Sequence, residues 1–202
     1  MQIVSDQLDE FSLSKSDTIL LIYESITGNS KKLACSVHEE LEALGFKARL
    51  CEAGKLKLHE DEAVSEFENA SLVVLLGWVK RSSFSPKIKQ LLEAHAKHLC
   101  DKKLAIMYTA GFVREPYPQK IYTLMQEDLL ACGLSKDQVL GFYLCQGKMP
   151  ESTKQRYLSG KDRHATSPEM IKLKIANWEE ALKHPSEDDL KAAKDFISQI
   201  IA

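Results

Sequence analysis

The chain alternates short, unbroken apolar runs with segments of helical period, and this alternation is the strongest constraint on its fold. The continuous runs occupy residues 18–23, 71–77, 104–109 and 139–145, and a weaker, alternating run occupies 46–51. Unbroken runs of this length are typical of strands buried on both faces, as in parallel sheets. Parallel strands joined through helices require right-handed crossovers. The pattern therefore predicts an α/β protein with five parallel strands.

Apolar residues at helical spacing occur in three segments between the runs, at 33–44, 88–99 and 121–132. A weaker helix is expected between the second and third strands. Two further helices are predicted after the last strand, beginning at Ser167-Pro168 and at Ser186. Residues 146–166, by contrast, are basic and poorly periodic, and a connection of this length is expected to be functional or mobile.

Length and composition limit the class of protein. At about 150 residues per domain, 202 residues predict a single domain over 1–202, with a core at about 18–145 and a C-terminal extension at 146–202. The 44% hydrophobic and 28% charged residues are ordinary for a globular chain, and a net charge of −2 disfavours nucleic-acid binding through bulk charge. Residues 1–70 carry 14 acids and 7 bases, a net of −7, so 71–202 carry +5.

Targeting and metal signals are not evident in the sequence. No apolar run approaches the roughly 18 residues of a membrane span, and residues 1–11 lack the basic and apolar regions of a signal peptide. Five cysteines without a C-x-x-C pair indicate free thiols in a reducing compartment, so we expect a cytoplasmic protein. No histidine pair has metal-binding spacing, and no metal is expected.

The sharpest motif is S-I-T-G-N-S at residues 25–30, directly between the first apolar run and the first helix. Small hydroxylated residues and a glycine let backbone amides approach an anion at the positive end of the helix dipole. A monophosphate fits such a turn, whereas the motifs of triphosphate and dinucleotide loops are missing. The alternative is a well-capped helix start that binds nothing.

This motif resembles the [ST]-x-T-G-x-[ST] phosphate loop of flavodoxins, which likewise follows a hydrophobic strand. The resemblance covers about residues 18–145 and implies FMN as cofactor. It also implies a doubly wound, five-stranded parallel sheet of order 2-1-3-4-5, for which flavodoxin is the type example, here with extra C-terminal helices. The loops after the third and fourth strands would contact the flavin ring. The implied cofactor-binding residues are Ser25, Ile26, Thr27, Gly28, Asn29 and Ser30, with the Thr27 and Ser30 hydroxyls on the phosphate, then Gly77, Trp78, Val79, Lys80, Thr109, Ala110, Gly111, Phe112, Gln146 and Gly147.

The later part of the chain adds a narrower resemblance and a departure. C-Q-G-K-M-P at 145–150, followed by Arg156-Tyr157, resembles a subgroup of longer flavodoxin-like proteins that includes flavodoxin-like partners of bilirubin reductase. Low-potential flavodoxins usually surround the flavin with acids, but here 78–92 carries four bases and no acid, and 148–174 carries seven bases and three acids. These bases form a solvated face, or they stabilise the reduced flavin, or they receive an anionic substrate or an acidic partner.

These features leave the function open between two redox classes. The first is an electron carrier that passes electrons to a partner reductase or acceptor protein. The second is an FMN-dependent reductase acting directly on a quinone, a tetrapyrrole or another conjugated anion. A flavin-free structural descendant is a third alternative. Trp78 and Phe112 either stack on the flavin or are structural, whereas Trp178, on a helical stripe, is predicted to be a core residue. Cys145 is not expected to be a catalytic thiol.

Overall fold

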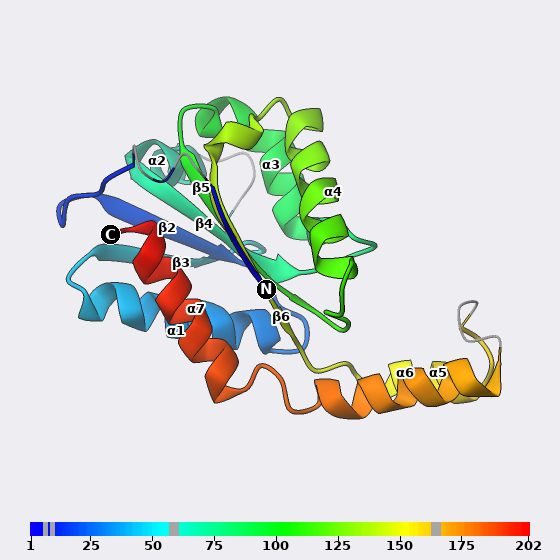
Figure 1. The fold of residues 1–202 in the computed structure, drawn as a ribbon. Helices are drawn as coiled ribbons and strands as arrows, with labels where there is room; N and C mark the ends of the chain where they lie inside the picture. The colour runs from blue at the N-terminus through cyan, green and yellow to red at the C-terminus, as the bar shows by residue number, and fades with distance from the viewer. Residues whose placement is uncertain (6–7, 9–10, 57–60, 163–166) are drawn as a thin grey trace.

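A computed structural model describes residues 1–5, 8, 11–56, 61–162 and 167–202 and has a six-stranded sheet at its centre (Figure 1). The strand order is β1-β6-β5-β4-β2-β3. Every pair from β3 to β6 is parallel. Taken without β1, the strands have the predicted order 2-1-3-4-5, which confirms the expected fold. The bounds are β1 (Gln2–Val4), β2 (Thr18–Tyr23), β3 (Lys47–Glu52), β4 (Ala70–Trp78), β5 (Lys103–Ala110) and β6 (Val139–Gln146).

The sixth strand, β1, was not predicted from the sequence. It pairs antiparallel with β6, with Gln2 opposite Tyr143 and Val4 opposite Gly141. Three residues are too few to show a strand period, so β1 is specified by the edge that it covers and not by its own pattern.

Helices cover both faces of the sheet, as Figure 1 shows. One face packs against α1 (Asn29–Ala43) and α7 (Glu187–Ile200), and the other against α2 (Asp61–Asn69), α3 (Pro86–Leu99) and α4 (Tyr117–Ala131). Along β4, Leu72 and Val74 lie in the core on the side of α1 and α7. Val73 and Leu75 lie in the core on the side of α2, α3 and α4. Burial on both faces explains why the strands are continuous apolar runs.

A helical hairpin lies between β6 and α7, outside these two layers (Figure 1, yellow to orange). It consists of α5 (Glu151–Leu158) and α6 (Pro168–Ala181). The sequence predicted α6 and α7, whose N-caps Ser167 and Ser186 accept hydrogen bonds from Met170 and Asp189 amides. It did not predict α5, because Tyr157 is the only buried residue of that helix and leaves no apolar stripe. Arg163, one of the seven bases of 148–174, lies outside the described residues.

The structure also shows whether its helices could span a membrane and whether its cysteines are paired. None of the helices described is long and apolar enough to cross a membrane. All five cysteines are free thiols.

Candidate functional site

A cavity of about 230 Å³, here named the edge cavity, lies where the carboxyl ends of the parallel strands meet the loops that follow them. Ligands of open α/β sheets bind at this edge, at the point where strand order reverses. Its walls come from four separate loops: Ile26, Thr27 and Asn29 after β2; Trp78 and Val79 at β4; Thr109, Ala110 and Gly111 at β5; and Gly147, Lys148, Met149 and Pro150 after β6. The structure therefore brings together most of the predicted site residues.

The turn between β2 and α1 presents donors that no side chain satisfies. Gly28 is the N-cap of α1 with φ 87°, a left-handed conformation that favours glycine. Within this fully described turn, α1 has neither a side-chain cap nor an acid in its first turn. The first amides of a helix carry partial positive charge. The Ser25 hydroxyl is buried and has no hydrogen-bond partner among the described residues. An anion at this turn would satisfy these groups.

Asn29 connects this turn to the loop after β6. Its buried side-chain amide donates to Thr27 Oγ1 and to the Lys148 carbonyl, both at 2.9 Å. A Cβ on Gly147 would lie 2.7 Å from Asn29 Nδ2, so glycine is required for this approach. The Asn29 amide therefore braces two loops together instead of standing free for a ligand.

Ser30 lies behind the cavity and not on its wall. Its hydroxyl is buried, 3.3 Å from Thr109 Oγ1, which in turn donates to the Gly77 carbonyl at 3.4 Å. Because the Thr109 hydroxyl donates its proton to the Gly77 carbonyl, it accepts the hydrogen bond from the Ser30 hydroxyl. The proposed Ser30 contact with a phosphate stays a prediction. Gly77 is a packing position, because a Cβ there would lie 2.6 Å from the ring of buried Tyr108.

Trp78 forms the aromatic wall of the edge cavity. Its indole Nε1 is buried without a partner among the described residues, although the side chain is part-exposed. Lys80 Nζ lies 5.2 Å from the indole centre, within reach of a cation–π contact. Arg81, at φ 52°, turns away and lines a different hollow beside Asp128. Phe112 is 42% exposed and also lies outside the edge cavity.

Gln146 holds the loop after β5 in place. Its buried side chain donates to the Gly111 carbonyl at 3.1 Å and to Asn177 Oδ1 at 3.3 Å. Asn177, on α6, donates to the same carbonyl at 2.8 Å. Sequence reasoning did not include Asn177, because its partner lies 66 residues away and no local pattern links them. It also left out Lys148, Met149 and Pro150, although they directly follow Gly147 in the quoted motif.

Basic side chains dominate the charge around the edge cavity. None of its described lining residues is acidic. Lys89, one of the bases expected near the flavin, instead pairs with Asp128 at 2.6 Å, and this hydrogen bond raises the pKa of Lys89. Lys80 and Lys148 remain beside the cavity. Burial raises the pKa of the Cys145 thiol to about 12, so the thiol is protonated at neutral pH and is a poor nucleophile.

A doubly wound parallel sheet of order 2-1-3-4-5 with a cavity at its switch point is the flavodoxin-like arrangement. The chain belongs to the flavodoxin domain family, whose model matches residues 20–198. It is 28% identical over 189 residues to the flavodoxin-like domain-containing protein BilS of Clostridioides difficile (strain CD3), covering 90% of this chain and 95% of that protein. The BilS of Clostridium symbiosum (strain WAL-14163) is 26% identical over 186 residues, covering 88% and 92%.

A solved structure supports the same fold. A short-chain flavodoxin associated with a non-canonical PDU bacterial microcompartment superimposes with a TM-score of 0.54 at 13% identity, covering 91% of this chain and 96% of that one. The sequence resemblance to flavodoxins is thus confirmed.

Family membership makes FMN the cofactor of this chain and gives it a redox role. The residues present fit that cofactor. The uncapped start of α1 suits a phosphate. Ser25 Oγ and Trp78 Nε1 are two buried donors without partners among the described residues, and FMN carries acceptors for both.

Proposed function

We propose that the chain is a single-domain FMN protein, over residues 1–202, that transfers electrons to a partner protein. The observation that carries this proposal is the edge cavity, where an uncapped helix start and an unpartnered indole donor meet within one hollow. Buried donors in native proteins are nearly always paired, so the unpaired Trp78 Nε1 beside this cavity is a candidate contact for a bound ring. The five free thiols support a reducing compartment such as the cytoplasm.

In this proposal each loop holds one part of FMN. The Thr27 hydroxyl and the first amides of α1 bind the phosphate, because Thr27 Oγ1 already accepts from Asn29 and keeps its own proton to donate. Trp78, Val79 and Gly111 line the space for the ring. FMN, when bound, supplies one- and two-electron chemistry. The residues of the chain orient it and shield part of it from water.

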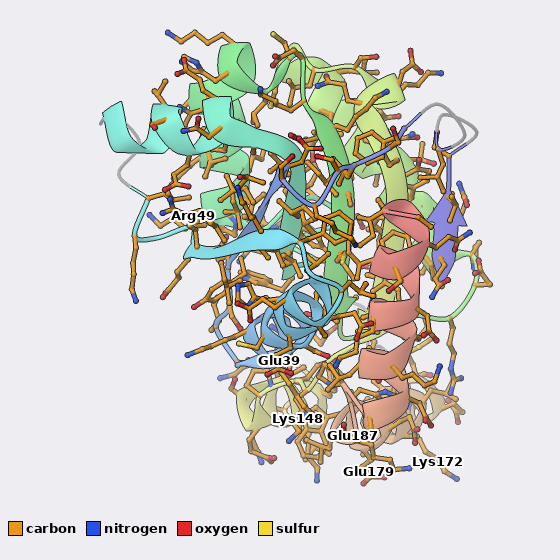
Figure 2. All side chains as sticks on the ribbon, turned by 90° about the vertical axis from the view of Figure 1, so that its left-hand side faces the viewer. Glu39, Arg49, Lys148, Lys172, Glu179 and Glu187 are labelled. Atoms are coloured by element: carbon orange, nitrogen blue, oxygen red, sulfur yellow. The ribbon has the colours of Figure 1, made fainter. Side chains whose placement is uncertain are left out.

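The charge near the site indicates what kind of partner would approach. Lys80 and Lys148 stand beside the edge cavity, whose described lining contains no acid. Figure 2 shows Lys148 well away from Arg49 on β3, at an end of the molecule where Glu179 and Glu187 also lie. Complementary charge steers encounter more than it strengthens binding. The proposed partner is therefore acidic around its own redox centre.

Cofactor binding is tested by titrating the flavin-free protein with FMN and with riboflavin, which lacks the phosphate. Thr27→Ala should weaken FMN about tenfold, because a hydrogen bond to a charged group is lost, and should leave riboflavin unchanged. Thr123→Ala is the matched control, since Thr123 is exposed on α4 and donates only within its helix. Equal losses for FMN and riboflavin would contradict the phosphate assignment.

Partner charge is tested with two small oxidants of opposite sign. After photoreduction without oxygen, the rate with ferricyanide should fall as salt is added, whereas the rate with hexaammineruthenium(III) should rise. The reverse pattern would contradict an acidic partner. The alternative function, a reductase of small molecules, is favoured by one observation, a second cavity described below. Steady NAD(P)H turnover with a small acceptor alone would support that alternative.

A further inference from the structure

A second, larger cavity adjoins the edge cavity, and neither the family nor the proposed carrier role accounts for it. It measures about 600 Å³ and lies between the α5–α6 hairpin and the loop after β5; we name it the hairpin cavity. A volume of this size accommodates a small organic ligand. The two cavities share Val79, Gly111 and Met149 as walls. A molecule in the hairpin cavity would therefore lie next to the proposed position of the flavin ring.

Met149 forms the partition between the two cavities. A Cβ on Gly111 would lie 2.6 Å from Met149 Sδ, so the thioether rests directly on the Gly111 backbone. The Gly111 carbonyl is in turn held by Gln146 and Asn177. Because a methionine side chain is flexible and polarisable, it provides an adaptable wall and not a rigid barrier.

Aromatic and aliphatic side chains line much of the hairpin cavity. Phe112 and Tyr117 pack edge to face, with ring centroids 5.7 Å apart, and Tyr157 of α5 lies on the same wall. Leu173 is 59% exposed and Met170 is 41% exposed, although both line this hollow. Apolar surface gathered in a hollow marks a binding site more often than isolated exposed residues do. Its chemistry suits a planar, apolar ligand.

Cations complete the walls. The charged side chains among the described lining residues are Arg114, Arg156 and Lys174, and none of the lining residues is an acid. Arg156 Nε and Lys174 Nζ share one nearby carboxylate, that of Asp162, at 3.5 and 3.0 Å. Arg114 is exposed and has no ion pair within the described part of the chain. Three cations against one carboxylate leave an excess of positive charge for a ligand.

We propose that the hairpin cavity binds a small aromatic anion, with its ring among Phe112, Tyr157 and Leu173 and its anionic group toward Arg114. The position of the ligand beside the flavin would make it an electron acceptor, and this role alone rests on the FMN binding in the proposed function. Binding itself requires only the walls described above.

The test uses the oxidised, FMN-loaded chain and equilibrium dialysis against 1,4-naphthoquinone-2-sulfonate. The neutral 2-methyl-1,4-naphthoquinone reports ring binding without the charge. Arg114→Gln should weaken the sulfonate about fivefold to tenfold and change the neutral quinone less than about twofold. Arg49→Gln, which removes the same charge on β3, should change neither affinity. Leu173→Ser should weaken both quinones, because it removes apolar wall that they share.

Each possible failure has a separate meaning. Flavin content, measured by absorbance before dialysis, tests the proposed function. A chain that holds no FMN contradicts that function, and the same dialysis of the flavin-free chain then tests the cavity, whose walls do not include FMN. A chain that holds one FMN and yet binds neither quinone saturably overturns the hairpin-cavity proposal. So does equal sulfonate affinity in wild type and Arg114→Gln. Folding of each variant is checked by its thermal unfolding midpoint, which Arg114→Gln and Leu173→Ser should not shift, whereas Arg49→Gln also removes the ion pair with Glu66.

Discussion

Replacing Asn29 with alanine would separate the two loops that this side chain braces. The Asn29 amide donates to Thr27 Oγ1 and to the Lys148 carbonyl, each at 2.9 Å, and the residue is only 8% exposed. Of the two bonds, only the one to Lys148 joins separate loops, and a lost hydrogen bond costs about 1 kcal/mol net. If all of this free energy serves to hold the loops in the flavin-binding arrangement, the dissociation constant rises roughly fivefold.

The assay is a titration of the flavin-free variant with FMN and with riboflavin, followed by quenching of flavin fluorescence. Because Asn29 ties the proposed phosphate turn to the loop after β6, which forms another wall of the edge cavity, Asn29→Ala should weaken both ligands, whereas Thr27→Ala should weaken FMN alone. Asn69→Ala is the matched control, since Asn69 donates only to Ser65 within α2. Unchanged affinity for both flavins in a folded Asn29→Ala protein would refute the reasoning.

Three further substitutions test the charge near the flavin, the packing at Gly77 and the burial of Cys145. Lys80→Gln should lower the midpoint potential of bound FMN by some tens of millivolts, because a cation about 8 Å away attracts the reduced flavin. A redox titration measures the shift. Arg81→Gln is the control and should cause no shift, because Arg81 lines a different hollow. Gly77→Ala should destabilise the fold by about 1–3 kcal/mol in urea unfolding, because the new Cβ would lie 2.7 Å from buried Ser85 Oγ. Gly54→Ala should be near neutral, because nothing lies within 4 Å of a Cβ at Gly54. Burial raises the pKa of Cys145 to about 12, against about 8.5 when unfolded, so the unfolded chain loses this proton first and stability falls as pH rises above about 9. The loss of stability between pH 7 and pH 10 should therefore be smaller in Cys145→Ala, and an equal loss in both proteins would contradict the assignment.

The parallel strands were predictable because their signal is local, whereas their order came only from the resemblance to flavodoxins. A strand buried on both faces must be apolar at successive positions, as Val73, Val74 and Leu75 are, and this pattern is visible without knowing the neighbours. The small-residue turn between β2 and α1 was predictable for the same reason. Residues 25–30 lie between one strand and one helix, so sequence neighbours are also spatial neighbours.

Tertiary contacts decided the features that the sequence did not reveal. β1 exists because β6 offers it an edge, and α5 because Tyr157 finds a burial place, although neither segment has a period of its own. The contact of Asn177 with the Gly111 carbonyl spans 66 residues, and that of Asn29 with Lys148 spans 119. Residue pattern alone thus specified the strands and the turn between β2 and α1, because burial and helix starts act over a few residues. Only the folded chain decided the loop braces and the hairpin cavity, because hydrogen bonds and cavity walls join side chains that no local spacing relates.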